Sequence, residues 1–597
     1  MAYKNGSGRL IIVSMAACLI FSVSTAWADV DTDGDGVPDA SDNCLMSANS
    51  DQRDSNGDGF GNLCDPDLNN DGKVDLIDFG MFRAAYGTGD PDADLNGNGS
   101  VDLADFGLLR SFYGAPPGPS GDGVGTGGDP HANLTYGAYP GNCLACHTEQ
   151  AGEMMQTTHY QWLGEAPDMT NGAGQRQGKL TNAVNSYCIN IEGNWPVCGS
   201  CHVGRGQRPD AAGNDLENID CLMCHNDDYA AQRTRLSDGS MGVAQPDDSM
   251  VRNVHRPTRA NCLTCHATAG GGDGVKRGDL SRATITNADR SFDVHMNSAG
   301  ADLECQSCHV FDKHKVIGKG SDLRPTDDLA RGSEISCLTC HTDKNSPNGH
   351  DTAKNNDHVA RVACQTCHIP EYAKVATETY RDWRTHHDGS PADASALPGH
   401  PYTEKVANLT PEYRFWDRKS DNALLGDDAS RTYNGDTDTW PTSTPLGSVT
   451  SGKLYPFKYK TAMQPKTRAD HRLIALNTFE YLKGTGNADA AIQQGLTAMG
   501  YPADEPYEWV LTDTHGMLNH GISPAANALQ CADCHGSIDR IDLQGELGYQ
   551  LKGSQSSVCT QCHGSEDNQG FTKIHDKHVR KENVDCNRCH TFSRPER

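Results

Sequence analysis

Ten copies of the pentapeptide Cys-x-x-Cys-His lie between residues 143 and 590 and use twenty of the 24 cysteines in this 597-residue chain. Two thiols at this spacing can add to the two vinyl groups of one haem, and the adjacent histidine can bind the iron from one face. Zinc knuckles and thioredoxin-like dithiols share the Cys-x-x-Cys spacing, but neither needs a histidine directly after the second cysteine. The repeat therefore predicts ten covalently attached haem c groups.

Each motif supplies two thioether cysteines and one axial histidine. The predicted cofactor-binding residues are Cys143, Cys146, His147, Cys198, Cys201, His202, Cys221, Cys224, His225, Cys262, Cys265, His266, Cys305, Cys308, His309, Cys337, Cys340, His341, Cys364, Cys367, His368, Cys531, Cys534, His535, Cys559, Cys562, His563, Cys586, Cys589 and His590.

The remaining histidines can close the second face of each iron. Of the 25 histidines, ten belong to the motifs and fifteen do not. Iron with two histidines suits electron transfer, whereas iron without a firm second ligand can bind a substrate. The second ligands that we expect are His131, His159, His295, His314, His358, His520, His575 and His578.

So many haems leave little room for a separate apolar core, and only 36% of the residues are hydrophobic. We therefore expect a mainly α fold with much irregular loop and little strand, organised around packed haems. Residues 369–530 carry no haem motif. Helical spacing at 470–483 and 487–499, with Gly484 and Gly500 as stops, predicts helices that cover the haem core.

The N-terminus has the features of an export signal. Lys4 and Arg9 precede an apolar run over residues 10–21, and Ala-Trp-Ala at 26–28 fits a cleavage site. A lipoprotein box ending at Cys18 is the alternative. The run is too short to span a bilayer, and we expect no transmembrane segment. The sequence predicts an exported protein in the periplasm, outside the cell or on its surface.

Acidic residues outnumber basic ones by 28, which argues against nucleic acid as a partner. The excess is greatest in residues 29–129, which are rich in Asp and Gly. Oxygen donors at every second position before a turn glycine are typical of calcium loops. The donors expected here are Asp31, Asp33, Asp35, Asp54, Asn56 and Asp58. Cys44 and Cys64 lie beside these loops and are expected to pair, and the segment resembles a thrombospondin type 3 repeat.

Two copies of a twelve-residue pattern follow, 27 residues apart. Their predicted calcium donors are Asp67, Asn69, Asp71, Asp75, Asp78, Asp94, Asn96, Asn98, Asp102 and Asp105. Position 12 is Asp rather than the Glu of an EF-hand. The pair resembles a dockerin repeat, which implies calcium and a cohesin-like partner. A calcium-stabilised spacer is the alternative.

Text between the haem motifs carries a further resemblance, over residues 130–540. The segments are NCLTCHATAGGGDGVKRGDL at 261–280, DVHM at 293–296, VACQTCHIPEY at 362–372 and NHGI at 519–522. These segments resemble the octahaem tetrathionate reductase family of multihaem cytochromes c. In that family the haem of the second motif is catalytic and has a lysine near or on its iron.

The resemblance assigns roles to matching residues of this chain. Asn-x-x-Cys corresponds to Asn185 and Cys188, and Asp-x-x-Lys to Asp273 and Lys276. Lys276 is then the labile or second axial ligand, and the other three line the catalytic cavity. A lysine can bind ferric iron when burial depresses its pKa. A family carboxylate after the seventh motif corresponds to Asp388.

The sequence thus predicts six segments: signal peptide 1–28, thrombospondin type 3-like repeat 29–66, dockerin-like pair 67–114, linker 115–130, octahaem core 131–540 and dihaem extension 541–597. The expected function is reduction of a small sulfur or nitrogen compound (tetrathionate, nitrite or hydroxylamine), with electrons from a cytochrome or a quinol dehydrogenase. A non-catalytic electron-transfer conduit is the alternative. Hydroxylamine oxidation stays open, and the absence of Cys-x-x-Cys-Lys disfavours a cytochrome c nitrite reductase proper.

Overall fold

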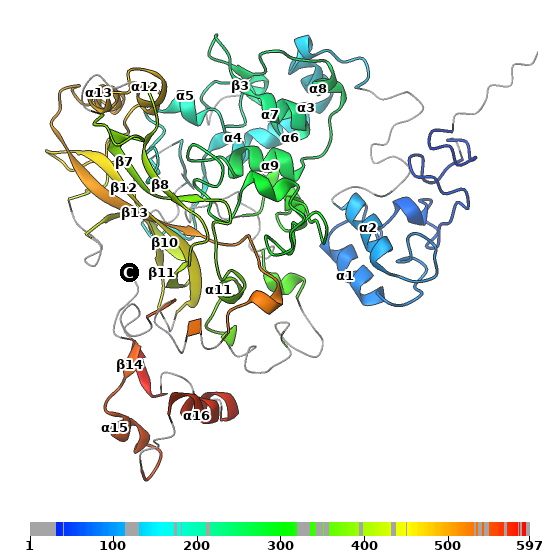
Figure 1. The fold of residues 1–597 in the computed structure, drawn as a ribbon. Helices are drawn as coiled ribbons and strands as arrows, with labels where there is room; N and C mark the ends of the chain where they lie inside the picture. The colour runs from blue at the N-terminus through cyan, green and yellow to red at the C-terminus, as the bar shows by residue number, and fades with distance from the viewer. Residues whose placement is uncertain are drawn as a thin grey trace, which may run out of the picture. The chain divides into compact units, whose positions relative to one another are not determined.

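The computed structural model divides the chain into two compact units, Met1–Gly128 and Asp129–Arg597 (Figure 1). It describes residues 31–39, 41–113, 117, 131–171, 176–180, 182–209, 215–318, 335–341, 350, 358–392, 398–430, 438–448, 451–530, 533–534, 540–542, 549–565, 570–582, 584 and 588–592. Within these ranges, no helix is long and apolar enough to cross a membrane.

The unit Met1–Gly128 consists of acidic loops followed by short helices. It contains η1 (Asn62–Cys64), α1 (Leu76–Ala85) and α2 (Leu103–Phe112). The predicted disulfide between Cys44 and Cys64 is confirmed. The rings of Phe79 and Phe106 lie 5.7 Å apart between the two helices. A small apolar core therefore joins the two halves of the repeat.

Both helices begin in the same way, as expected from the repeated sequence. The backbone N–H of Asp75 donates to the Asp78 carboxylate over 2.7 Å. The equivalent bond from Asp102 to Asp105 is 2.9 Å long. These reciprocal caps satisfy orphan N–H groups at the helix start, so the last carboxylate of each loop is also part of the helix N-terminus.

Short helices dominate the first half of the second unit. They are η2 (Tyr136–Ala138), α3 (Gly141–Met155), α4 (Thr158–Gln161), α5 (Trp195–Cys198), η3 (Leu216–Asn218), α6 (Leu222–His225), α7 (Asp227–Gln232), α8 (Ser249–Arg252), α9 (Arg259–His266), η4 (Arg282–Ile285), η5 (Cys305–Ser307), η7 (Cys337–Thr339) and α11 (Cys364–His368). Two-stranded ribbons lie among them: β1 (Gly164–Glu165) with β2 (Arg176–Gln177), β3 (Thr234–Arg235) with β4 (Met241–Gly242), and β5 (Phe311–Asp312) with β6 (Lys315–Val316).

A seven-stranded mixed sheet follows, and it makes the prediction of a mainly α fold wrong (Figure 1). Its strands are β7 (Thr377–His386), β8 (Pro401–Val406), β9 (Glu412–Trp416), β10 (Lys419–Asn422), β11 (Trp440–Leu446), β12 (Lys453–Thr467) and β13 (Tyr507–Met517). The order is β10-β11-β13-β12-β7-β8, and β9 pairs with β12. The pairs β11·β13 and β12·β7 are parallel, and the other pairs are antiparallel.

The central strand β12 explains why the sequence pattern hid this sheet. Lys458, Lys460, Gln464 and Lys466 are all buried on β12. Alternation of apolar and polar residues is the usual signal of a strand, and buried lysines remove it. The sheet was therefore missed where its charged residues point inward.

Two helices pack against the sheet. They are α12 (Thr478–Lys483) and α13 (Ala488–Ala498), whose buried side chains cluster with Trp383 and Trp440. The helix predicted at 487–499 is thus confirmed, but of the one predicted at 470–483 only the last turns form. The C-terminal part contains η9 (Ala525–Asn527), β14 (Tyr549–Leu551), α15 (Gln555–Cys559), α16 (Phe571–His575), the π-helix η10 (Asp576–Lys581) and β15 (His590–Phe592).

Candidate functional site

Several haem motifs form a single helical turn. In the motif that starts at Cys305, the N–H of His309 donates to the Cys305 carbonyl over 2.8 Å. The Cys337 and Cys559 motifs repeat this bond, to His341 and His563, at 2.9 and 3.0 Å. One turn brings residues three and four apart onto the same side. Both thiols and the imidazole can therefore meet one macrocycle.

Opposed histidine rings test whether these residues fit a haem. Six motif histidines face a second histidine with ring centroids 6.1 to 6.4 Å apart. The pairs are His147 with His131, His266 with His159, His309 with His520, His341 with His295, His368 with His350, and His590 with His575. Metal–imidazole bonds of about 2 Å would place two rings on opposite sides of one metal with centroids about 6 Å apart. The pairs thus fit iron between them.

Two further motif histidines have a histidine nearby. The Nε2 atoms of His563 and His578 lie 3.2 Å apart, which is too close for an intervening iron. Burial lowers the pKa of His225, and the nearby His314, His255 and His147 lower it further. The His314 Nδ1 donates to the Glu153 carboxylate over 3.0 Å, which leaves its other nitrogen for a metal.

The structure thus places seven of the eight expected second ligands near motif histidines: His131, His159, His295, His314, His520, His575 and His578. It adds His350, which the sequence interpretation did not select. His358 closes a turn, since its carbonyl accepts from the N–H of Arg361. Cys531, His535 and Cys586 lie outside the described residues.

Thiols of different motifs also meet. The neighbouring pairs are Cys201 with Cys265, Cys262 with Cys305, and Cys337 with Cys364. Because each cysteine marks the edge of one macrocycle, these contacts bring the second, fourth and fifth sites into a series and join the sixth to the seventh. Such edges are the positions between which electrons would pass.

The second motif has different surroundings. His202 is fully buried, and its ring lies 5.1 Å from Tyr160, 5.6 Å from Trp162 and 5.2 Å from Trp195 between centroids. Its Nε2 lies 2.5 Å from the Tyr160 carbonyl oxygen, and burial lowers its pKa to about 4. In the part of the chain that is described, aromatic rings rather than a histidine surround this imidazole.

An arginine holds the backbone of this motif. Arg233 donates to the carbonyls of Ser200, His202 and Gly204 over 2.7, 3.0 and 2.6 Å. Its Nε lies 2.6 Å from Asp220. Burial opposes the charge of Arg233, but Asp220 outweighs it and raises the arginine pKa. The turn that follows Cys198 is therefore fixed by a buried ion pair.

The Asn185 turn presents Cys188. The Asn185 Oδ1 accepts from the N–H groups of Tyr187 and Cys188 over 2.8 and 3.0 Å, so the amide is used within its own turn. The Asn194 side-chain amide donates to the Cys188 carbonyl over 3.3 Å, and the Asn194 carbonyl accepts from the N–H of Cys198 over 2.9 Å. Asn194, at the start of α5, therefore joins the Cys188 turn to the second motif.

The loop that carries Lys276 reaches the same place. Gly270, Gly271 and Gly274 have positive φ, which lets the backbone fold tightly. The Lys276 Nζ lies 5.9 Å from the centre of the Tyr187 ring, and the Tyr187 hydroxyl donates to the Lys276 carbonyl over 3.3 Å. The structure thus brings Lys276, Asn185 and Cys188 together around Tyr187.

The two predicted aspartates have other contacts. The Asp273 carboxylate accepts from the N–H of Arg282 over 2.7 Å. Asp388 lies on an exposed turn after β7 and accepts from Ser390 over 2.6 and 2.9 Å. The carboxylate that lies beside Tyr187 is instead Glu378, which the sequence interpretation did not select.

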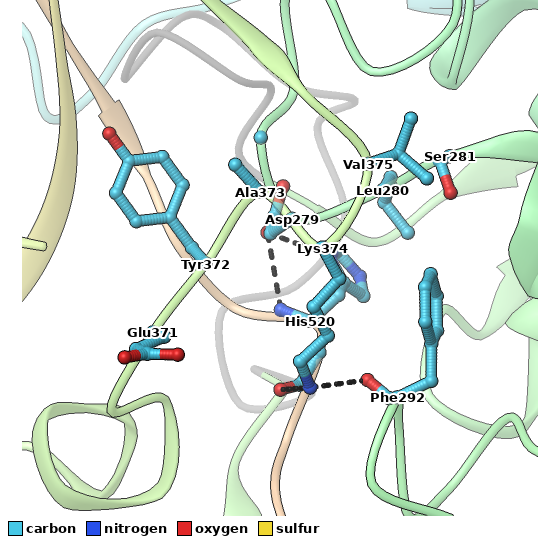
Figure 2. Close-up of a pocket in the computed structure, with 12 residues that line it drawn as sticks. Asp279, Leu280, Ser281, Phe292, Glu371, Tyr372, Ala373, Lys374, Val375 and His520 are labelled. Atoms are coloured by element: carbon cyan, nitrogen blue, oxygen red, sulfur yellow. Dashed lines mark hydrogen bonds and ion pairs between the residues drawn. The ribbon is translucent and has the colours of Figure 1, made fainter. Parts of the chain in front are cut away.

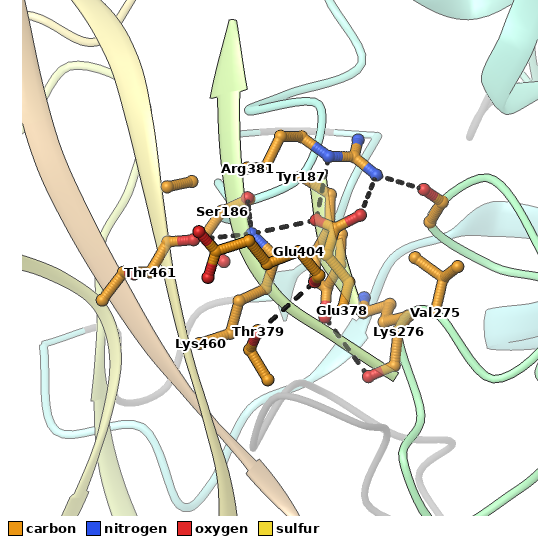
Figure 3. Close-up of polar contacts among 12 residues, drawn as sticks. Ser186, Tyr187, Val275, Lys276, Glu378, Thr379, Arg381, Glu404, Lys460 and Thr461 are labelled. Atoms are coloured by element: carbon orange, nitrogen blue, oxygen red, sulfur yellow. Dashed lines mark hydrogen bonds and ion pairs between the residues drawn. The ribbon is translucent and has the colours of Figure 1, made fainter. Parts of the chain in front are cut away.

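Four cations surround the Tyr187 ring, and Figure 3 shows three of the residues involved together with Glu378. The distances from the ring centre are 4.4 Å for Lys460, 5.5 Å for Arg381, and 5.9 Å for Lys276 and Lys458. The Glu378 carboxylate accepts from Arg381 over 2.7 and 2.9 Å and lies 3.3 Å from Lys460. This cluster, which we call the Tyr187 cluster, has more positive than negative charges.

A separate pocket is lined in part by His520 (Figure 2), whose ring lies 6.2 Å from that of His309. The His520 Nδ1 bonds Asp279 over 3.0 Å, and Asp279 also binds Arg277. Burial opposes the charge of Asp279, but Arg277 and His520 lower its pKa. A carboxylate behind a ligand histidine fixes the ring orientation, so this pocket belongs to a ligand pair.

Comparisons with known proteins agree with a haem assignment. Residues 378–538 match the family "Cytochrome c bacterial", residues 517–591 match "Cytochrome c7 and related cytochrome c", and residues 311–369 match "Cytochrome c554 and c-prime". Residues 17–52 match the thrombospondin type 3 repeat.

A solved structure and a curated protein are also similar. The octahaem cytochrome c from Shewanella oneidensis is 29% identical with a TM-score of 0.55, over 66% of this chain and 89% of that one. An uncharacterized protein of Archaeoglobus fulgidus is 28% identical over 29% of this chain and 73% of its own. The chain is a multihaem c-type cytochrome, and it functions in electron transfer.

Proposed function

We propose that this cytochrome is an exported decahaem reductase in which the haem of Cys198, Cys201 and His202 is the reaction centre. The observation that carries the proposal is the contrast between His202, surrounded by aromatic rings, and six motif histidines that face a second histidine. An iron with an exchangeable second position can take a substrate. Held by Cys198, Cys201 and His202, a haem would supply electrons at that position, and haems held by the other nine motifs would relay them.

The Tyr187 cluster favours a small anion as substrate. Tetrathionate carries two negative charges, takes up two electrons and yields two thiosulfate ions with four charges in all. Preorganised cations stabilise charge that develops during a reaction. Lys276 and Arg381 are placed for this role, whereas neutral hydroxylamine gains little from them. We therefore place tetrathionate first and nitrite second.

The role of Lys276 follows from its loop. We propose that it is the labile or second axial ligand of the second haem and that Cys188, on the Asn185 turn, lines the cavity. Asp273 lies three residues before Lys276 and is proposed to act on the loop through its bond to Arg282. Asp388, on its exposed turn after β7, is proposed as the family carboxylate.

Lys276→Ala tests the proposal, with the exposed Lys419→Ala as a matched control. We expect Lys276→Ala to keep ten haems by pyridine haemochrome absorbance, to lose tetrathionate turnover and to change one iron signal in the electron paramagnetic resonance spectrum. Lys419→Ala should match the unsubstituted protein. Full turnover in Lys276→Ala would contradict the assignment.

A non-catalytic conduit is the second candidate, because opposed histidine pairs are the ligation that electron transfer needs. The spectrum of the oxidised protein separates the two. Ten equivalent low-spin irons and no reduction of tetrathionate, nitrite or hydroxylamine would favour the conduit. In either case we propose a partner cytochrome or quinol dehydrogenase as the electron donor, in the periplasm or at the cell surface.

We also propose that the acidic repeats of the N-terminal unit bind calcium. Asp31, Asp33 and Asp35 bring carboxylate oxygens within 4.8 Å of one another. Oxygen donors at this spacing suit Ca²⁺. The dockerin-like pair then serves as a spacer or binds a cohesin-like protein. Calorimetric titration with Ca²⁺ tests binding, and an absence of heat would contradict it.

A further inference from the structure

Three buried side chains on one face of β12 contact the loop that carries Lys276 and the Asn185 turn that carries Cys188. Lys458, Lys460 and Gln464 occupy alternate positions along the strand, so they point to the same side of the sheet. Their exposed fractions are 3%, 0% and 0%. A buried ammonium group is costly unless its hydrogen bonds are satisfied. The two ammonium groups therefore need hydrogen-bond acceptors inside the protein.

Lys458 holds the loop that carries Lys276. Its Nζ donates to the carbonyls of Val275 and Lys276 over 2.6 and 3.3 Å, and it also bonds Thr377 of β7. These two carbonyls lie directly before and after the Cα atom that carries the Lys276 side chain. Lys458 thus fixes the Lys276 backbone to the sheet.

Lys460 and Gln464 hold the turn that carries Cys188. The Lys460 Nζ donates to the Ser186 carbonyl over 2.7 Å, and the Gln464 amide donates to the Asn185 carbonyl over 3.1 Å. Both acceptors lie within three residues of Cys188. The turn is therefore attached to β12 immediately beside the Lys276 loop.

Strand β7 strengthens the arrangement. Arg381 donates to the Gly270 carbonyl over 2.7 Å, at the start of the glycine-rich loop. Glu378 binds both Arg381 and Lys460, so it ties the two strands together (Figure 3). The loop is thus held at both ends, and the same ion-pair network reaches the Cys188 turn.

We propose that Lys458 and Lys460 are positioning residues that set the separation of Lys276 and Cys188 at the second haem. The inference rests on the proposed function. Residues two apart on a strand are about 7 Å apart, so the sheet supplies a rigid spacing that loops alone do not. Neither lysine needs to touch the substrate, since each acts through backbone carbonyls.

The test compares Lys458→Met and Lys460→Met with Lys466→Met. Lys466 is buried on the same face of β12 but donates to the Ala429 carbonyl over 2.8 Å, away from both loops in sequence. All three changes remove a buried ammonium group and keep the aliphatic stem. They should cost similar thermal stability and leave ten haems in the protein.

We expect Lys458→Met and Lys460→Met to change the resting electron paramagnetic resonance signal of one iron and to lower kcat for tetrathionate about tenfold to a hundredfold. Lys466→Met should leave both unchanged. Gln464→Met changes no charge and should shift the same iron signal. This variant keeps the test possible if the lysine variants fail to fold. If the unsubstituted protein is active but Lys458→Met, Lys460→Met and Gln464→Met behave like Lys466→Met, the positioning role is refuted. If the unsubstituted protein is itself inactive and has ten equivalent irons, the proposed function fails instead.

Discussion

Replacing Asp220 with Asn should destabilise the chain far more than breaking a comparable ion pair at the surface. Asp220 and Arg233 are 2.6 Å apart, with side chains only 0% and 2% exposed. Asn keeps the size of the side chain but removes its charge, which leaves the guanidinium of Arg233 buried without a counter-ion. The hydroxyls of Tyr139 and Tyr229, which donate to Asp220 over 2.7 and 3.0 Å, also lose a charged acceptor.

The expected magnitude follows from burial. Removing one partner of a buried ion pair costs about 3 to 5 kcal/mol, because the other charge stays uncompensated. The control is Glu192→Gln. Glu192 and Arg208 lie 2.8 Å apart, but their side chains are 31% and 40% exposed. Exposed pairs contribute about 0 to 1 kcal/mol, so the control should change stability little.

Urea unfolding followed by far-ultraviolet circular dichroism measures both variants. Because Arg233 also donates to carbonyls of the second motif, Asp220→Asn should in addition change the resting iron signal of that haem. Equal losses below about 1 kcal/mol in both variants would refute the reasoning, since burial would then not decide the energy of the pair.

Three further predictions concern other regions. Burial lowers the pKa of Lys460 to about 8, so between that pH and about 10.4 the unfolded chain binds more protons than the folded chain, and the free energy of unfolding should rise with pH. Lys460→Met should reduce this rise, as measured by urea midpoints at pH 8 and pH 10. An unchanged difference between the two midpoints would contradict the prediction. Chelation by EGTA should lower the calorimetric midpoint of the N-terminal unit, and an unmoved midpoint would argue against calcium. Replacing Cys44 and Cys64 together with Ser opens a disulfide that joins residues 20 apart and should cost that unit about 3 kcal/mol, whereas equal stability would show that the disulfide has no such effect.

The haem sites could be predicted because their chemistry is local. A thioether pair and its histidine fit within five residues, so the motif is visible in the sequence. The second ligands are not local, so the sequence could offer candidate histidines such as His520 but not the motif that each one faces. His520 faces His309 from more than two hundred residues away, and His350 faces His368 without a distinguishing neighbour. Only the packing of the chain brings these rings to opposite sides of one iron.

The sheet and the Tyr187 cluster were missed for one shared reason. Lysine and arginine are normally exposed, so Lys458, Lys460 and Arg381 look like surface residues in the sequence. In the structure they are buried, and their charges bind carbonyls and Glu378. Inward-pointing cations at alternate positions of residues 453–467 were the available signal, and they obscured the strand that they occupy.

A reaction centre needs a different support from an electron relay. At a relay site two opposed histidines would bind the same iron, so that iron would itself hold together the two segments that carry them. At the proposed reaction centre one face must admit substrate, and within the described residues aromatic rings rather than a second histidine surround His202. There, buried cations of β7 and β12 bind backbone carbonyls of the two loops and hold them. In the proposed reaction centre the sheet thus does what a second histidine does at a relay site, because its hydrogen bonds hold the loops that carry Lys276 and Cys188.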